Sequence, residues 1–245
     1  MVKSFKSALF WVYYFIVITT CLIATSIVFL LTFWFDRYRI WPNRIVRYLG
    51  IAMIKINPGW KTTIEGTEHY KKGEPVIFIS NHQGFMDMPL LYLLPWQMKW
   101  VSKKSLFKIP ILGWLISLSG HLAIDRKQKG VVKQLFALEE PVKNGVPVMI
   151  FPEGTRTMNG DVKSFKNGAF MMATKLDVPV QPVIIDGSFQ IFPTGEWRFN
   201  FQQPLYIKIT PKIYPSEFSS IDEFKKTCHH RIENELTKYR LQSSK

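Results

Sequence analysis

Residues 7–35 carry no charged side chain, and this apolar, aromatic-rich run constrains the fold more than any other feature of the chain. As an α-helix, the run would be about 43 Å long, whereas the hydrocarbon core of a bilayer is about 30 Å thick. A cleaved signal peptide has a much shorter apolar stretch that ends in small residues, whereas this run ends in three aromatic residues before the charges of Asp36 and Arg37. The run therefore predicts a helix that anchors the chain in a membrane.

Basic residues indicate on which side of the membrane the rest of the chain lies. Lys3 and Lys6 precede the apolar run, and four arginines follow it, namely Arg37, Arg39, Arg44 and Arg47. By the positive-inside rule, this excess predicts the cytoplasmic side of the cell membrane. Residues 40–56 predict a second helix, which either lies in the membrane interface or packs on a globular domain. We therefore expect membrane-anchoring helices in residues 1–57 and a globular domain in residues 58–245, with spanning and hairpin attachment both open.

The chain is strongly basic, since 32 Lys and Arg residues against 18 Asp and Glu residues give a formal net charge of +14. Such a charge favours an anionic partner: nucleic acid, an anionic membrane or a phosphorylated substrate. Nucleic acid is not expected, because no recognition motif is present and the basic residues flank an apolar run. The two cysteines, Cys21 and Cys228, exclude a disulfide framework or a cysteine-based zinc site and are typical of a reducing compartment.

From about residue 60, short β-branched runs alternate with helical stretches. The predicted strands are residues 76–79, 122–124, 146–151 and 180–185, with a further strand or strand pair within 199–210. The predicted helices are residues 87–94, 106–119, 130–143, 165–176 and 221–241. This alternation is typical of an α/β fold. We therefore expect a mostly parallel or mixed sheet that is flanked by helices and preceded by the apolar N-terminal helix.

The first cluster of polar residues, Asn81, His82 and Asp87, directly follows a predicted strand. If His82 lies in the turn and Asp87 in the first turn of the next helix, the carboxylate can bind one ring nitrogen and leave the other free as a base. The alternative is a histidine that binds a carboxylate for structural reasons only. Because the same interval separates a His and a Glu at two other places in the chain, the spacing alone does not decide between them.

The second cluster follows the next predicted core strand and comprises Glu153, Gly154, Thr155 and Arg156. A glycine-containing turn exposes backbone N–H groups, the threonine adds a hydroxyl group, and the planar guanidinium of Arg156 suits a phosphate group. The alternative is a polar turn that contains a local ion pair between Glu153 and Arg156. Both interpretations put these residues at the carboxyl end of a strand, where α/β sheets place their sites.

Two further clusters are basic or mixed in charge. Asp125 and Arg126 follow the strand at residues 122–124 and form either a structural ion pair or a ligand contact. Four lysines occur between residues 96 and 110 without an acidic residue: Lys99, Lys103, Lys104 and Lys108. They form either a solvated helix face or a surface that contacts an anionic headgroup or acyl donor.

Together these clusters resemble the lysophospholipid acyltransferases, most closely the 1-acylglycerol-3-phosphate acyltransferases, over roughly residues 60–210. The matching blocks are Asn-His-x4-Asp at 81–87, Lys-x-x-Leu-Phe-x-x-Pro at 103–110, Gly-x4-Asp-Arg at 120–126, Phe-Pro-Glu-Gly-Thr-Arg at 151–156 and Val-Pro-x-x-Pro-Val at 178–183. Two positions depart from the family pattern, because Gly84 replaces the usual serine and Ala123 a bulky residue. Both departures concern substrate detail rather than the class of reaction.

The resemblance implies a reaction and a set of roles. His82, oriented by Asp87, would take the proton of the free sn-2 hydroxyl of lysophosphatidic acid as it attacks an acyl-CoA or acyl carrier protein thioester, without a covalent acyl-enzyme. The implied substrate-binding residues are Asn81, Lys103, Arg126, Glu153, Gly154, Thr155 and Arg156. No metal and no cofactor besides the thioester co-substrate is implied, and residues 58–245 would form the catalytic domain. The alternatives are another lysolipid acceptor or a non-catalytic protein that binds lipid phosphate.

Overall fold

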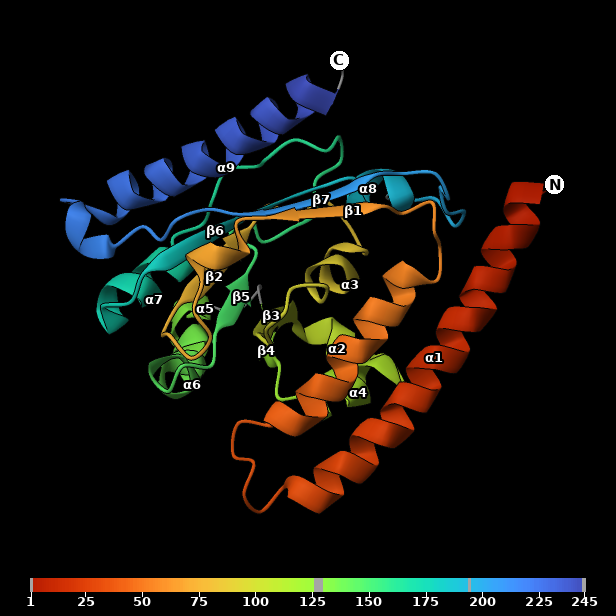
Figure 1. The fold of residues 1–245 in the computed structure, drawn as a ribbon. Coiled ribbons are helices and arrows are strands. Elements are labelled where there is room, and N and C mark those ends of the chain that lie inside the picture. Colours follow the sequence, from red (N-terminus) through yellow and green to blue (C-terminus); the bar gives the residue numbers. More distant parts are fainter. Residues whose placement is uncertain (1, 126–129, 194, 244–245) are drawn as a thin grey trace.

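Seven strands form a single sheet in the computed structural model, which describes residues 2–125, 130–193 and 195–243 (Figure 1). The strand order is β1-β7-β6-β2-β5-β3-β4, and all neighbours are parallel except β6 and β7. The strands are β1 (Thr62–Glu65), β2 (Ile77–Ser80), β3 (Lys99–Lys103), β4 (Leu122–Ile124), β5 (Val148–Ile150), β6 (Val180–Asp186) and β7 (Leu205–Ile209). The predicted α/β fold with a mostly parallel or mixed sheet is confirmed.

Helices cover both faces of the sheet (Figure 1). One face carries α1 (Val2–Thr32), α2 (Ile40–Lys55), α3 (Asp87–Leu91) and α4 (Leu112–Leu118), and the other carries α5 (Val131–Leu135), α6 (Glu139–Lys143), α7 (Gly168–Leu176) and α9 (Ile221–Ser243). The short α8 (Ser188–Ile191) follows β6. Alternate residues of β2 enter the two cores, since Phe78 packs in one while Ile77 and Ile79 pack in the other. Burial on both faces is why the central strands are continuous apolar runs in the sequence.

The structure contains two strands, β1 and β3, and one short α-helix, α8, that the sequence does not predict, and the predicted helices at 106–119 and 130–143 are each divided. β3 is absent from the prediction because the lysines of residues 96–110 indicated a helix face. In the structure Lys99 is buried, and its ammonium group donates to the carbonyl oxygens of Ser119 at 2.7 Å and Arg39 at 3.2 Å. A charged residue at a buried strand position hides the apolar pattern on which the prediction depends. The predicted helix at 106–119 is divided at Pro110. The ring of a proline clashes with the backbone of the preceding residue, so that residue rarely adopts the helical conformation.

The long helix α1 lies along the domain rather than projecting from it (Figure 1). The Tyr14 hydroxyl donates to the carbonyl oxygen of Met53 at 2.9 Å, and the Ser7 hydroxyl accepts the N–H of Phe199 at 3.0 Å. The buried residues form one stripe along the helix, namely Ser7, Tyr14, Cys21 and Thr25. By length and composition α1 could cross a membrane. One side of α1 packs on the domain along part of its length.

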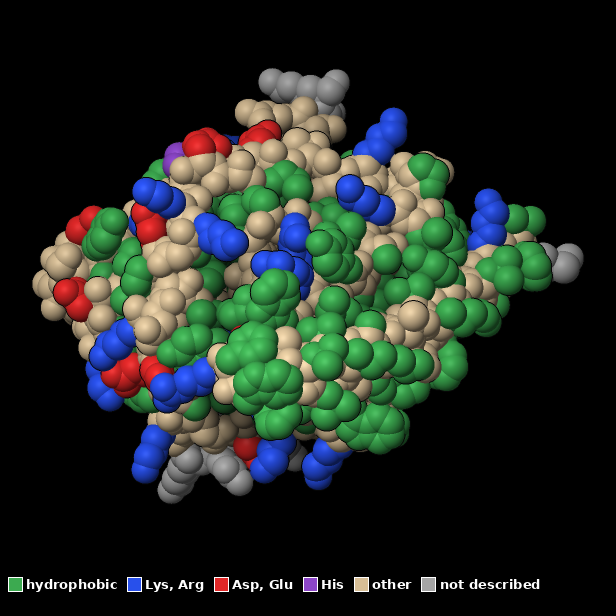
Figure 2. All heavy atoms as spheres, turned by 60° about the horizontal axis from the view of Figure 1, so that its bottom comes forward, with side chains coloured by type: hydrophobic (Ala, Val, Ile, Leu, Met, Phe, Trp, Pro, Cys, Tyr) green, Lys and Arg blue, Asp and Glu red, His purple; other side chains and the backbone are tan. Residues whose placement is uncertain are grey.

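The outer side of α1 is apolar. Figure 2 shows hydrophobic side chains gathered over this side of the molecule, with Lys and Arg side chains around the border. The exposed large hydrophobic residues of α1 and the turn after it are Val2, Phe5, Leu9, Trp11, Val12, Phe15, Ile16, Ile23, Ile27, Leu30, Leu31, Phe33, Trp34 and Phe35. Water-soluble monomers rarely expose so many contiguous apolar side chains. We call this surface the apolar face. It suits association with a membrane.

Candidate active site

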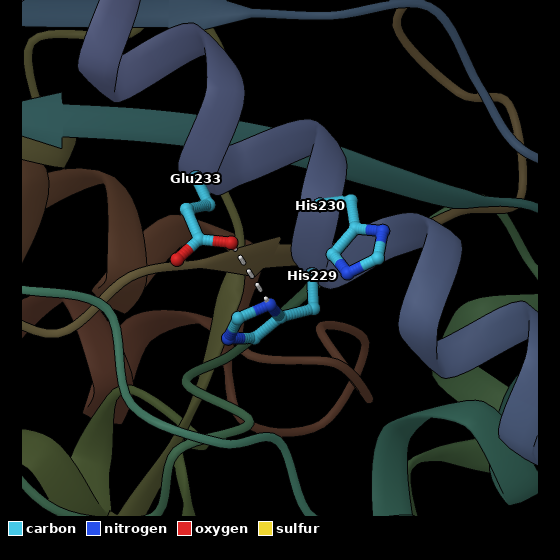
Figure 3. Close-up of side chains that lie close together, drawn as sticks. All are labelled: His229, His230 and Glu233. Atoms are coloured by element: carbon cyan, nitrogen blue, oxygen red, sulfur yellow. Dashed lines mark ion pairs between the residues drawn. The ribbon is translucent and has the colours of Figure 1, made fainter.

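A cluster of potential metal ligands lies on α9, at a distance along the chain from the motifs described above. His229, His230 and Glu233 bring three ligand atoms within 4.8 Å of one another (Figure 3). The two histidines are consecutive on a helix, so their side chains leave it about 100° apart. The His229 ring also packs edge-on against Phe165, with centroids 4.7 Å apart, and its Nδ1 lies 3.7 Å from a Glu233 carboxylate oxygen. This cluster is a surface group of packed and ion-paired side chains, and the reactive groups predicted from sequence lie elsewhere.

His82 and Asp87 form a close pair at the carboxyl end of β2. Nδ1 of His82 lies 2.6 Å from Oδ2 of Asp87, whose side chain is fully buried while that of His82 is 17% exposed. The intervening turn folds back because the backbone N–H groups of Gln83 and Gly84 also donate to the Asp87 carboxylate, at 2.7 and 2.9 Å. With Nδ1 engaged by the carboxylate, Nε2 is the ring nitrogen left to exchange a proton with a substrate.

Ser188 completes the environment of the Asp87 carboxylate. Its hydroxyl donates to Oδ1 of Asp87 at 2.5 Å and lies 3.1 Å from the side-chain oxygen of Gln83. The buried Asp87 carboxylate is therefore surrounded by backbone, imidazole and hydroxyl groups that hydrogen-bond to it. Sequence reasoning missed Ser188. The available signal was that Ser188 follows the end of β6, at the same edge of the sheet as the predicted clusters.

Glu153 belongs to the turn after β5, and its carboxylate contacts the backbone of His82. Its Oε1 accepts the backbone N–H of His82 at 2.9 Å, and its residue is only 3% exposed. Burial raises the pKa of Glu153 to about 7, against the opposing effect of the backbone N–H groups of His82 and Lys163. The N–H of Thr157 donates to the carbonyl oxygen of His82 at 2.8 Å, and the Phe151 ring stacks on the imidazole with centroids 4.2 Å apart. The turn after β5 therefore fixes both the backbone and the ring of His82.

The predicted phosphate-binding residues lie at the same edge, in solvent. Thr155 and Arg156 are exposed, and Gly154 has a φ of 71°, a conformation that glycine adopts without strain. The Lys163 ammonium donates to the carbonyl oxygen of Arg156 at 2.9 Å, which ties the turn to the segment before α7. Lys103 ends β3, the parallel neighbour of β5, and is exposed. The sheet topology thus groups these cations around the edge at which His82 lies.

The remaining predicted residues have different surroundings. Asn81 is buried, and its amide group exchanges two hydrogen bonds with the backbone of Ile185, at 2.8 and 2.9 Å, so that it ties the end of β2 to β6. The Asp125 carboxylate lies 4.0 Å from the Lys104 ammonium. Arg126, which the sequence pairs with Asp125, lies outside the described residues.

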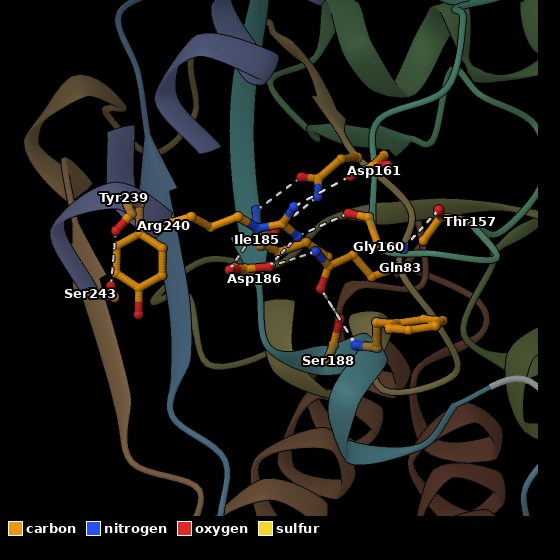
Figure 4. A network of polar contacts seen from close by, with 12 residues as sticks. Gln83, Thr157, Gly160, Asp161, Ile185, Asp186, Ser188, Tyr239, Arg240 and Ser243 are labelled. Atoms are coloured by element: carbon orange, nitrogen blue, oxygen red, sulfur yellow. Dashed lines mark hydrogen bonds and ion pairs between the residues drawn. The ribbon is translucent and has the colours of Figure 1, made fainter. Parts of the chain in front are cut away.

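A polar network joins this site to the C-terminal helix (Figure 4). The Gln83 side chain donates to the Asp186 carboxylate at 2.8 Å. Arg240 of α9 donates to both oxygens of that carboxylate, at 2.8 and 3.2 Å, and to the carbonyl oxygen of Gly160 at 2.9 Å. Sequence reasoning missed these contacts, because no local pattern connects a residue of α9 with one beside His82. The network connects the turn containing His82, the end of β6, the loop after the Arg156 turn and α9.

Comparisons with known proteins agree with this geometry. The family described as Acyltransferase matches residues 61–186, just over half of the chain. A chloroplastic 1-acyl-sn-glycerol-3-phosphate acyltransferase of Brassica napus is 38% identical over 185 residues, which are 75% of this chain and 54% of that protein. A chloroplastic relative with the same name from Arabidopsis thaliana is 39% identical over 163 residues, 66% of this chain and 46% of that one. The chain thus spans about half the length of these curated relatives.

A solved structure matches over almost the whole chain. The crystal structure of the 1-acyl-sn-glycerophosphate acyltransferase PlsC from Thermotoga maritima superposes with a TM-score of 0.82 and is 27% identical in sequence. The match covers 97% of this chain and 98% of that one, so it includes the N-terminal helices as well as the sheet. The fold, the matched motifs and these relatives lead to one conclusion: the chain belongs to the acyltransferase family.

Proposed function

We propose that the protein is a 1-acyl-sn-glycerol-3-phosphate acyltransferase, which transfers a fatty acyl group from an acyl thioester to the sn-2 hydroxyl of lysophosphatidic acid and yields phosphatidic acid. The observation that carries this proposal is the 2.6 Å contact between His82 and the buried Asp87, beside a turn that ends in Arg156. The printed names of the relatives support the same acceptor and reaction. The thioester, from acyl-CoA or acyl carrier protein, is the only co-substrate that the reaction requires.

The reaction proceeds by general-base catalysis in this proposal. Nε2 of His82 takes the proton of the acceptor hydroxyl while that oxygen attacks the thioester carbonyl carbon, and Asp87 stabilises the resulting imidazolium. The tetrahedral intermediate collapses, the carbon–sulfur bond breaks, and the imidazolium returns its proton to the leaving thiolate. The products are phosphatidic acid and the free thiol, with His82 restored to its neutral form. General-base catalysis of this kind contributes about 10²- to 10⁴-fold in rate.

The surroundings of His82 account for substrate delivery. Arg156, Thr155 and Lys103 are exposed at the site edge and bind the acceptor phosphate, the guanidinium through two parallel hydrogen bonds. The acceptor is a bilayer lipid, and the apolar face places the protein at the membrane surface that holds it. The domain lies on the cytoplasmic side of the cell membrane, from which the water-soluble thioester arrives.

The test is a thiol-release assay on full-length, detergent-purified protein with palmitoyl-CoA and lysophosphatidic acid. Wild type should release thiol and form phosphatidic acid only when the acceptor is present, and His82→Ala should lose about 10²- to 10⁴-fold of that rate. His69→Ala is the matched control, because His69 is exposed, ends the short helix Thr67–His69 and makes none of the contacts described for the pair. Product formation that survives His82→Ala refutes the mechanism. A wild type that is inactive with palmitoyl-CoA and, in a repeat of the assay, with palmitoyl–acyl carrier protein refutes the proposed function.

A further inference from the structure

A second group of cations lines a cavity at the opposite edge of the sheet from His82. The cavity measures about 340 Å³, and its lining residues come from α2 and from the segments that precede β2, β3 and β5: Ile40, Arg44, Arg47, Tyr48, Tyr70, Lys72, Gly73, Pro95, Trp96, Gln97, Gly145, Val146 and Pro147. These three strands are mutually parallel, and the candidate active site follows their carboxyl ends. The cavity is therefore separated from the candidate active site by the length of the sheet.

The charges in this cavity are unbalanced. Arg44, Arg47 and Lys72 line it, and none of the lining residues is acidic. In the part of the chain that the structure describes, no carboxylate forms an ion pair with any of the three, whereas Lys143 and Lys212 elsewhere do have carboxylate partners. Cations that converge on a concave surface without acidic partners favour an anion there.

Arg47 is the most buried of these cations. Its Nε donates to the carbonyl oxygen of Leu94 at 2.9 Å, which fixes the guanidinium against the wall of the cavity. Burial, with a smaller contribution from the positive charge of Arg44, lowers the pKa of Arg47 from its usual value. A half-buried guanidinium bound only to a neutral carbonyl gains more from an anionic partner than a solvated one does, because the low dielectric strengthens the attraction.

The wall of the cavity also holds polar atoms without partners. Nε1 of Trp96 and Oε1 of Gln97 are buried, and no described residue forms a hydrogen bond with either. Both atoms are enclosed by protein, so the cations are the groups that reach an anion in the cavity.

The position of the cavity connects it to the membrane. Arg44 lies over the ring of Trp41 at 4.6 Å, and both Trp41 and Tyr48 are exposed on α2, the helix that lies directly after α1 and its aromatic turn. Exposed Trp and Tyr side chains beside arginines are typical of a protein surface at the headgroup level of a bilayer. A lipid headgroup can therefore approach the cavity from the side on which α1 meets the membrane.

We propose that this cavity is a second anion site, which binds the phosphate group of a glycerol phosphate ester through Arg44, Arg47 and Lys72. The ester is either the headgroup of an anionic membrane lipid or a soluble glycerol phosphate. A volume of about 340 Å³ is at the lower end of the range for ligand pockets. It accommodates a glycerol phosphate group but is small for a nucleotide. The cavity is distant from His82. Binding of a ligand to the cavity can therefore be measured directly, and the result does not depend on the proposed acyltransferase reaction.

The test compares two double variants with the same change of charge. Arg44→Gln with Lys72→Gln removes two cations that line the cavity, whereas Lys55→Gln with Lys71→Gln removes two exposed cations, one also from α2 and one adjacent to Lys72, that do not. Both variants keep the candidate active site, so any binding there is the same in each. Circular dichroism and thermal unfolding verify that both full-length proteins remain folded.

Two measurements distinguish the two sources of phosphate. Isothermal titration calorimetry uses sn-glycerol 3-phosphate with the protein in detergent, and vesicle sedimentation uses phosphatidylcholine with and without phosphatidylglycerol. The cavity variant should bind at least about tenfold more weakly than the control in one or both assays, since each charge-assisted hydrogen bond contributes about 1.5–3 kcal/mol. A loss with vesicles alone assigns a lipid headgroup, and a loss with glycerol 3-phosphate assigns a free ester. Equal binding by the two variants in both assays overturns the proposal.

Discussion

Replacing Glu153 by Gln tests the finding that a buried carboxyl group lies behind His82. The change keeps the size of the side chain and the oxygen that accepts the N–H of His82, but removes the ionisable group. Burial raises the pKa of this carboxyl from 4.5 to about 7 in the folded protein. Between these two values the folded state binds more protons than the unfolded state, so the stability that Glu153 contributes falls as the pH rises.

The magnitude follows from the two pKa values. A difference from 4.5 to about 7 corresponds to about 3 kcal/mol in total, of which about 2–3 kcal/mol falls between pH 5 and pH 8. Glu153→Gln has no such dependence. Relative to wild type, the variant should therefore gain about 2–3 kcal/mol in free energy of unfolding as the pH is raised from 5 to 8.

The assay is urea-induced unfolding in detergent micelles, followed by tryptophan fluorescence at several pH values. Glu217→Gln is the matched control, because Glu217 lies in an exposed turn and its replacement should leave the pH dependence of wild type unchanged. The reasoning is refuted if the curves of wild type and Glu153→Gln run parallel from pH 5 to pH 8, or if the variant loses stability relative to wild type as the pH rises.

Two further predictions concern residues that only the structure revealed. Ser188→Ala removes the hydroxyl donor of Asp87 and should lower kcat about tenfold or more, because a hydrogen bond to a charged group contributes about 1.5–3 kcal/mol. Ser119→Ala, which removes a buried hydroxyl at the end of α4, is the control, and equal losses of kcat in both variants contradict the assignment. Arg240→Gln and Asp186→Asn should each lower the free energy of unfolding by about 1–2 kcal/mol, and the double variant by less than their sum. Strict additivity in urea unfolding contradicts a direct coupling.

Sequence reasoning predicted the parts of the site that adjacent residues build. His82 and Asp87 meet because β2 ends at Ser80 and α3 already begins at Asp87, so that one short turn separates them. Glu153 and Arg156 reach the same edge because parallel core strands place their carboxyl ends together. The apolar runs of β2, β5 and β6 identified these strands, since residues buried on both faces of a sheet leave a continuous signal.

The remaining contacts depend on tertiary structure. Ser188 lies 101 residues after Asp87, and Arg240 lies 54 residues after Asp186 and 80 residues after Gly160. Neither position has a distinctive local pattern. β3 was missed because Lys99 is buried at a strand position where an apolar residue is expected. Backbone carbonyl groups from two other segments of the chain satisfy its ammonium group, and the local sequence carries no sign of them.

The packing of α1 on the domain has a consequence for how the chain folds. Ser7 binds the backbone of Phe199, and Phe10 packs against Trp60 and Phe201, so the inner side of the first helix gains its partners from residues synthesised far later. Until those partners are synthesised, neither side of the helix is covered by the domain, and the apolar outer side is accommodated by lipid. We expect the helix to reach the bilayer first and the sheet to assemble against it, so that the domain folds at the membrane surface rather than docking there once complete.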